Sequence, residues 1–314
     1  PGKNGNALQL TGDDGVNLGI GNFKRTAPFS VALWMSTPHH KERTVVFSRS
    51  RAWTDAGSRG YQMLLRDGHL SASLIHFWPG NAINVRTKAK LPKAKWHHVA
   101  ITYDGSTKAS GLEIYVDGKL AETEIYKDNL YKNITGGGGD TIVIGQRFRD
   151  VGFAGGLVDD FRVFKRELTG GEVAQIHDGE SLAKLLAKPA DALGQAERDT
   201  LREYFLATAN ESHDAQLAKL RASRARVTKL LDGKGEIMVM EEMPLNPRST
   251  FVLKRGVYSA PGERVGAATP RSLSPFPKGA PSNRLGLAKW LVDPKNPLTA
   301  RVAVNHFWQL CFGQ

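Results

Sequence analysis

Two neighbouring runs decide the fold class: WHHVAITYD at residues 96–104 and LEIYVDGK at residues 112–119. In the first run Val99, Ile101 and Tyr103 alternate with other residues, so they lie on one face of an extended strand. The second run ends in an Asp-Gly pair, which suits the positive φ angles of a two-residue hairpin turn. Together the two runs predict antiparallel β structure.

The same pattern continues outward in both directions, from residue 7 to about residue 165. Short runs of apolar alternation are separated by Gly, Asp and Asn, as is typical of an antiparallel all-β domain. About ten or more strands at this spacing predict a two-sheet antiparallel jelly-roll sandwich. Further strands are predicted by the runs FSVALW (29–34), YQMLL (61–65), LSASLI (70–75), TIVIG (141–145) and GGLVDDFRVF (155–164).

The period of the apolar residues changes after residue 165. Thr169 and Glu172 form a capping-box pattern, which predicts a short helix that ends near His177. Residues 195–231 carry apolar positions at helical spacing, and we expect a break at Asn210. Many charged side chains in this stretch indicate a solvated helical connector.

The last part of the chain has a different composition. Residues 244–281 are rich in proline and glycine, which predicts irregular structure with one or two strands. Helical spacing returns at residue 283 and again at residues 298–312. We therefore expect three segments: a sandwich at 1–178, a helical connector at 179–234, and a partial, mixed, loop-rich region at 235–314.

Composition narrows the classes of protein. The chain has 314 residues, enough for two cores, and a formal net charge of +12. The basic excess is spread over all three segments without a recognisable nucleic-acid-binding module, so we expect no nucleic-acid partner. One local basic run, which we interpret as a solvated strand edge and loop, consists of Arg86, Lys88, Lys90, Lys93 and Lys95.

Other function classes are excluded by what the sequence lacks. It has no apolar stretch of about 18 residues, so we expect no membrane span. Its single cysteine, Cys311, allows neither an internal disulfide nor haem attachment through a C-x-x-C-H motif, and we expect it to lie in a core.

Residues 1–178 resemble the laminin-G-like concanavalin superfamily. The resemblance rests on the runs at 29–34, 96–104, 112–119 and 155–164, the last followed by the capped helix, in this order. It implies a jelly-roll domain that binds a ligand more often than it transforms one. The superfamily includes glucanases, but the Glu-x-Asp-x-x-Glu-like strand typical of those enzymes is missing, so we assign no catalytic residue.

Residues 235–314 resemble the first part of a domain of unknown function from large planctomycete proteins, often found beside cytochrome-c-like domains. The resemblance implies an extracytoplasmic protein and a domain that continues past Gln314. His306 stands where the family commonly has Arg. The resemblance rests on MVME (238–241), RSTFVLKRGVY (248–258), PGE (261–263), NRLGLAKWL (283–291) and NPLTARVAVNHFW (296–308).

A sugar-binding site would use aromatic rings that stack on sugar rings, with polar groups that contact the hydroxyls. Trp53, in RAWTD (51–55), and Trp78, in HFWPGN (76–81), are the best candidates, with core packing as the alternative for each. We add Tyr61, His76 and Asn81 as further ligand contacts. Trp34 and Trp96 lie in predicted strands, so we interpret them as core residues.

A calcium ion needs several oxygen ligands from loops. The candidates are four carboxylates beside turns, Asp13, Asp14, Asp104 and Asp140. Aspartate is also an ordinary turn residue that accepts hydrogen bonds from its own backbone, so both roles stay open. The pairs His39-His40 and His97-His98 point to opposite faces of a strand, and neither pair can chelate one metal alone.

The C-terminal resemblance draws attention to a polar set. Its members could belong to a functional site, or they could be buried groups that hold irregular loops through hydrogen bonds to carbonyl oxygens. The set consists of Arg248, Arg255, Arg284, Arg301, Asn305 and His306.

Three hypotheses for function follow. The leading one is a non-catalytic carbohydrate-binding or adhesive module of a larger envelope or secreted protein, with a glycan as partner. The second is an accessory part of a redox-linked or polysaccharide-acting enzyme whose active site lies downstream. The third is a structural spacer or protein-contact domain.

Overall fold

A computed structural model describes residues 2–53, 58–235, 237, 239 and 249–313. The chain forms two compact units, residues 1–235 and residues 236–314. The sequence predicted a boundary after residue 178, but the connector helices group with the sandwich in the first unit.

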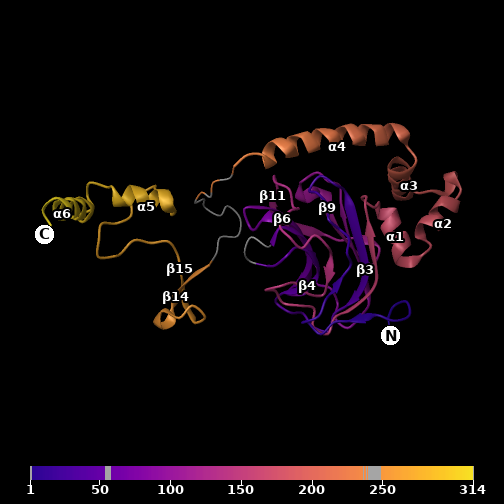
Figure 1. The fold of residues 1–314 in the computed structure, drawn as a ribbon, viewed down its shortest axis with the longest axis horizontal. Coiled ribbons are helices and arrows are strands. Elements are labelled where there is room, and N and C mark those ends of the chain that lie inside the picture. Colours follow the sequence, from indigo (N-terminus) through magenta and orange to yellow (C-terminus); the bar gives the residue numbers. More distant parts are fainter. Residues whose placement is uncertain (1, 54–57, 236, 238, 240–248, 314) are drawn as a thin grey trace. The chain divides into compact units, whose positions relative to one another are not determined.

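The first unit is built on two β-sheets (Figure 1). Within the described residues one sheet has six strands and the other seven, and all strand pairs in both are antiparallel. This confirms the predicted sandwich. The six-stranded sheet has the order β1 (Leu8–Gln9), β13 (Leu157–Phe164), β3 (Phe29–Ser36), β8 (His97–Tyr103), β9 (Leu112–Val116), β10 (Lys119–Leu120). The seven-stranded sheet has the order β11 (Thr123–Asn129), β7 (Asn81–Thr87), β6 (His69–Phe77), β5 (Gly60–Arg66), β4 (Thr44–Arg49), β12 (Val143–Ile144), β2 (Val16–Asn17).

The main core lies between the two sheets. Val99 and Ile101 of β8 pair with Leu33 and Val31 of β3, and all four side chains belong to one buried apolar cluster. The cluster contains the alternate residues from which the strands were predicted. Trp96 is an exception to the predictions, because it precedes β8 and is only half-buried.

Helix α1 (Gly170–Asp178) covers the outer face of the six-stranded sheet. Val173 of α1 packs in a second apolar cluster with Ala32 and Ala100, which lie opposite one another on β3 and β8. The predicted capping box is present: the Thr169 hydroxyl accepts from the Glu172 amide, and the Glu172 carboxylate accepts from the Thr169 amide.

Trp34 is buried on this outer face, against the rings of His98 and His177, rather than between the sheets.

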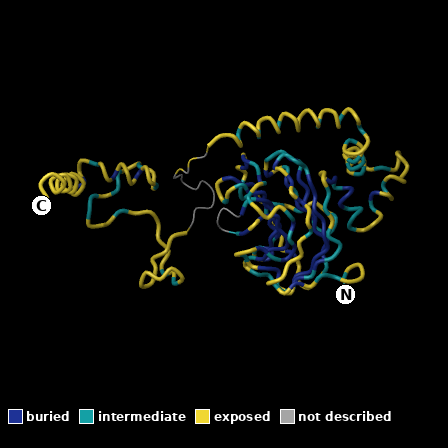
Figure 2. The backbone as a smooth tube through the Cα atoms, in the orientation of Figure 1, coloured by how far each residue is buried: buried dark blue, intermediate teal, exposed yellow. Residues whose placement is uncertain are grey.

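The remaining helices of the first unit are α2 (Ser181–Ala187), α3 (Gln195–Thr208) and α4 (Glu211–Asp232). The break between α3 and α4 falls at Asn210, whose side chain accepts from the His213 amide and caps α4. Helix α4 has no buried residue, as its charged sequence predicted (Figure 2). At its end, the Asp232 carboxylate accepts from the Asn133 amide at 3.0 Å.

The second unit has little buried surface. Trp290 is 5% exposed, and its indole donates to the Ser274 carbonyl at 2.8 Å. Cys311 is exposed, so its predicted core position is wrong: helix α6, which carries it, has no buried residue. The elements are β14 (Thr250–Leu253), β15 (Pro261–Val265), α5 (Arg284–Leu291) and α6 (Thr299–Phe312). Among the described residues of the whole chain, no helix combines the length and apolarity that crossing a bilayer requires.

Candidate functional site

The structure brings together the two tryptophans that the sequence singled out. Trp53 follows β4 and Trp78 follows β6, and their ring centroids lie 6.0 Å apart with the planes 52° to each other. Both side chains are half-buried. They form an aromatic pair at one end of the seven-stranded sheet.

Two arginines hold Trp53 from the protein side. The guanidinium carbon of Arg43 lies 4.0 Å from the centroid of the Trp53 ring, and that of Arg147 lies 5.2 Å away. Cations at these distances are attracted to the negative face of an indole. The Trp53 amide also donates to the Phe148 carbonyl at 3.1 Å, which joins Trp53 to the loop that carries Arg147.

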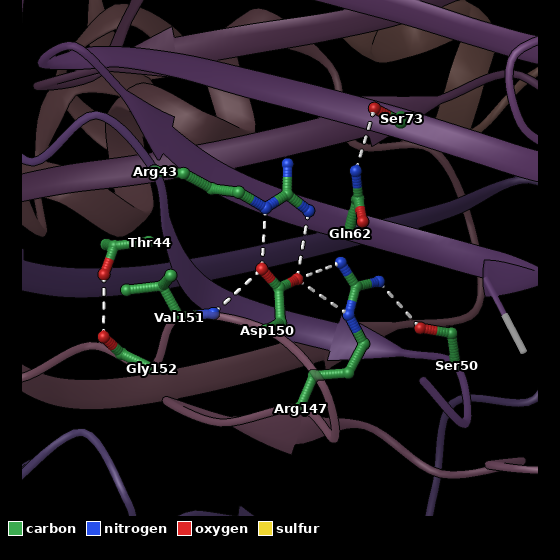
Figure 3. Close-up of polar contacts among 9 residues, drawn as sticks. All are labelled: Arg43, Thr44, Ser50, Gln62, Ser73, Arg147, Asp150, Val151 and Gly152. Atoms are coloured by element: carbon green, nitrogen blue, oxygen red, sulfur yellow. Dashed lines mark hydrogen bonds and ion pairs between the residues drawn. The ribbon is translucent and has the colours of Figure 1, made fainter. Parts of the chain in front are cut away.

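Asp150 joins the two arginines (Figure 3). It accepts two hydrogen bonds from Arg43, at 2.6 and 3.0 Å, and two from Arg147, at 2.5 and 3.1 Å. Arg147 also donates to the Ser50 hydroxyl at 2.9 Å. We call Arg43, Arg147 and Asp150 the arginine cluster.

Burial and charge oppose one another in the arginine cluster. Burial favours the neutral form of Asp150, but the hydrogen bonds and charges of Arg43 and Arg147 hold the pKa of its carboxyl below the ordinary value. Burial lowers the pKa of Arg147 to about 10, against the pull of Asp150. Arg147 and Asp150 are therefore both ionised at neutral pH, and the Asp150 carboxylate lies between the guanidiniums of Arg147 and Arg43.

A row of buried polar side chains crosses the face of the seven-stranded sheet that is turned away from the main core. The strand register places Ser48 opposite Gln62, Gln62 opposite Ser73, and Ser73 opposite Asn84. Asn84 donates to the Ser73 hydroxyl at 2.7 Å. Gln62 donates to the Ser73 hydroxyl at 3.4 Å (Figure 3). The Gln62 carbonyl oxygen and the Ser48 hydroxyl are buried with no hydrogen-bond partner among the described residues.

His76 lies near the tryptophan pair on the same strand end as Trp78. Its Nδ1 is 2.5 Å from the Asn133 carbonyl oxygen, and its Nε2 is 3.3 Å from an Arg59 guanidinium nitrogen. Gly137 packs on the side chain of this arginine. A role for His76 in ligand binding stays a prediction.

Tyr61 and Asn81 are corrections to the predicted ligand contacts. Tyr61 is 1% exposed; its hydroxyl donates to the Gly21 carbonyl at 2.7 Å, and its ring packs on Phe29. Asn81 is 3% exposed, and its side-chain oxygen accepts from the Tyr131 amide at 3.0 Å. Tyr61 is therefore a core residue. Asn81 is buried at the start of β7 and holds the chain at Tyr131.

The four carboxylates proposed for calcium lie beside turns. Asp14 accepts from the Thr11 amide at 2.8 Å, which lowers the pKa of its carboxyl, and Asp104 accepts from the Ser106 amide at 2.7 Å. Asp140 lies 3.7 Å from the Arg49 guanidinium, and Asp13 is exposed. Among the residues that the structure describes, no three His, Cys, Asp or Glu side chains are placed to hold a metal ion. Calcium binding stays a prediction.

Residues 10–174 match the family described as the concanavalin A-like lectin/glucanases superfamily, over more than half of the chain. The chain belongs to this superfamily. The tryptophan pair, the arginine cluster and the polar row all lie within the superfamily domain. Among curated proteins, none matches the chain.

Several solved structures are similar to the superfamily domain. The binding domain of Paraclostridial Mosquitocidal Protein 1 is 15% identical, with a TM-score of 0.44 over 57% of this chain and 44% of that one. The CBM40 of Ruminococcus gnavus IT-sialidase, bound to alpha2,3 sialyllactose, is 14% identical, with a TM-score of 0.43 over 55% of this chain and 96% of that one. A mutant of the NanB sialidase from Streptococcus pneumoniae is 16% identical, with a TM-score of 0.41 over 54% of this chain and 27% of that one. The chain thus spans less than half of the first of these structures.

Outside the superfamily domain, residues 283–314 match a protein of unknown function (DUF1553). The structure shows the described members of the predicted polar set as exposed, and their role stays a prediction. Arg301 and Asn305 share one side of α6 with Trp308. The exposed members are Arg255, Arg284, Arg301, Asn305 and His306, and Arg248 lies outside the described residues.

The arginine cluster and the polar row were missed from the sequence. Ser71 and Ser73 alternate with apolar residues in β6, and that alternation could have indicated a polar outer face. No comparable signal marks Arg43, Arg147 and Asp150. They meet because the loop after β12 folds back beside β4, where the Val45 amide donates to the Val151 carbonyl at 2.9 Å.

Proposed function

We propose that the superfamily domain is a non-catalytic carbohydrate-binding module whose ligand lies against Trp53 and Trp78. The observation that carries this proposal is the contact between two loop tryptophans that are distant in sequence, with ring centroids 6.0 Å apart. Aromatic faces of this kind stack on the apolar faces of sugar rings, and neighbouring polar groups fix the orientation of the sugar.

The arginine cluster supports the proposal because it holds Trp53, one ring of the tryptophan pair. A guanidinium over Trp53 and a buried carboxylate between two guanidiniums hold the Trp53 ring in place, which lowers the conformational cost of binding. Phe148, in the loop that carries Arg147, is 62% exposed, and its carbonyl oxygen accepts from the Trp53 amide.

The test uses the whole chain on a glycan array that contains neutral, uronic-acid, sulfated and sialylated glycans, with calcium and with a chelator. Calcium dependence would support the proposed carboxylate ligands. Binding to no glycan on the array, together with tight binding to a protein, would overturn the proposal in favour of a protein-contact domain.

Tryptophan variants locate the site once a glycan is found. We expect Trp78→Ala to weaken binding about tenfold, since a stacked aromatic contact contributes about 1 kcal/mol beyond its buried area. Trp308→Ala is the matched control, because Trp308 is exposed on α6 in the other unit. Equal losses in the two variants would place the ligand elsewhere.

The proposal includes an extracytoplasmic location in a larger envelope or secreted protein, which the resemblance to large planctomycete proteins supports. Fractionation of native cells tests it. Recovery of the protein only from the cytoplasm would contradict this part of the proposal and leave the glycan site to be judged separately.

A further inference from the structure

A second concave site lies at the other end of β6 from the tryptophan pair. A cavity of about 370 Å³ is lined by Leu70, near the start of β6, and by Leu91 and Val116. Trp78 follows the opposite end of the same strand. The cavity is therefore separate from the proposed glycan site, and its volume lies at the lower end of the usual range for small-molecule sites.

The walls of this cavity contain a paired histidine and carboxylate. Asp117 Oδ2 lies 2.8 Å from Nδ1 of His97, and Asp117 Oδ1 accepts from the backbone amide of His98 at 3.0 Å. A carboxylate can only accept, so the Nδ1 of His97 carries a proton and donates it to Asp117. In the neutral ring, Nε2 is then an acceptor.

That acceptor is unpaired within the part of the chain that the structure describes. His97 is 8% exposed, and its Nε2 is buried with no hydrogen-bond partner among the described residues. Buried polar atoms in folded proteins are almost always bonded, so an unpaired atom on a residue that lines a cavity points to a group that enters the cavity.

Water alone fits this cavity poorly. A buried water needs about two to four polar partners, and two further polar side chains of the lining are bonded within the protein. The Thr87 hydroxyl donates to the Ala89 carbonyl at 2.8 Å, and Lys88 is paired with Glu122 at 3.4 Å. A molecule with one donor and an otherwise apolar body suits the walls better.

We propose that this cavity binds a small, mainly apolar molecule that carries one hydroxyl group, of the size of a substituted phenol, and that the hydroxyl donates to His97 Nε2. At roughly 30 Å³ for each water-sized group, the volume accommodates about a dozen heavy atoms. The site does not depend on the proposed glycan function, and neither result decides the other.

The first experiment is calorimetric titration of the intact chain with 4-methylphenol and with 4-fluorotoluene. The two probes have almost the same shape, but only the phenol can donate a hydrogen bond. We expect the phenol to bind about tenfold more tightly, the usual gain from one buried hydrogen bond. Failure of both probes to bind at millimolar concentration, or equal affinities, would overturn the proposal.

The variant Asp117→Asn tests the role of the histidine. Asparagine has the same shape and tolerates the φ of 49° at this position, so the turn should survive. Its side-chain oxygen must still accept from the His98 amide, which leaves its NH₂ group facing His97 Nδ1. That nitrogen becomes the acceptor, and the proton moves to Nε2.

In Asp117→Asn the direction of the hydrogen bond reverses: the phenol oxygen accepts from the protonated Nε2, so we expect a preference for the phenol to remain. The decisive variant is His97→Leu, which keeps an apolar side chain at this position and should bind the two probes alike. A tenfold preference that persists in His97→Leu would show that His97 Nε2 is not the hydrogen-bond partner of the phenol.

Discussion

At the scale of single residues, Asp150 has the largest effect on the candidate site. Its carboxylate is almost completely buried and is surrounded by two guanidiniums, both of which face the ring of Trp53. A buried ion pair contributes little net stability when it is complete, but removal of one partner leaves uncompensated charge in a poorly solvated place. The two guanidiniums that face Trp53 therefore share one acidic partner, Asp150.

The variant Asp150→Asn should destabilise the first unit by about 3 kcal/mol, because Arg43 and Arg147 lose their buried counter-ion. Urea unfolding followed by circular dichroism measures this loss. Glu180→Gln breaks the exposed pair with Lys184 and is the control, with an expected loss of about 0.5 kcal/mol or less. Equal losses would mean that Asp150 is not a buried counter-ion.

The same residues show how far the sequence could predict the site. Loop position and residue type were enough to select Trp53 and Trp78, because sugar-stacking rings need a loop and a polar neighbourhood. Tyr61 was misassigned because a polar tip on an apolar strand has the same sequence pattern whether it faces a ligand or the core. Arg43 and Asp150 could not be paired, since their contact depends on tertiary folding.

At the scale of elements, helix α1 is the best example of local sequence that determines structure. The Thr169 hydroxyl and the Glu172 carboxylate satisfy amides at the start of the helix, and Arg166 donates to the same carboxylate at 2.6 and 2.9 Å. The helix then buries Val173 against the outer face of the six-stranded sheet. The cap therefore fixes where α1 begins, and Val173 in its first turn packs on the sheet.

The variant Thr169→Ala should cost about 1 to 2 kcal/mol, because the Glu172 amide loses its acceptor in a buried place. Thr169→Ser keeps the hydroxyl and should cost only a few tenths of a kcal/mol. The free energy of unfolding in urea measures both. If the serine variant lost as much as the alanine variant, the methyl group rather than the cap would be the stabilising feature.

The sequence predicted single strands and helices better than it predicted which of them form one compact unit. The β8 strand and the β9–β10 hairpin follow from period-2 alternation and an Asp-Gly turn, which are local signals. The assignment of the connector helices to the first unit was not predictable in the same way. It depends on contacts such as the Asp232 carboxylate with the Asn133 amide, which join residues far apart in sequence.

At the scale of the whole molecule, the first unit buries a histidine, His98, where its charged form is disfavoured. His98 is 1% exposed between the six-stranded sheet and α1, against the rings of Trp34 and His177. Burial lowers the pKa of His98 from 6.5 to about 4, and His177 adds to this effect. Of the other charged groups that act on it, Asp117 and Asp160 raise the pKa and Arg162 lowers it.

The stability of the first unit should therefore fall as the pH decreases from about 6.5 to about 4. The unfolded chain takes up a proton at His98 near pH 6.5, whereas the folded chain resists it until about pH 4, so acid favours the unfolded state. The full difference of 2.5 pKa units limits this contribution to about 3 kcal/mol. Above pH 6.5 the group is neutral in both states and contributes no slope.

The variant His98→Phe separates this contribution from that of the carboxylates, because it keeps a ring against Trp34 and removes the titration. Urea unfolding at a series of pH values between 7.5 and 4 should show that the wild-type chain loses more stability than the variant, with the gap growing by about 2 to 3 kcal/mol over this interval. His39→Gln, in an exposed position, is the control and should follow the wild type. Parallel pH profiles for wild type and His98→Phe would mean that His98 takes up its proton without disturbing the contact between α1 and the sheet.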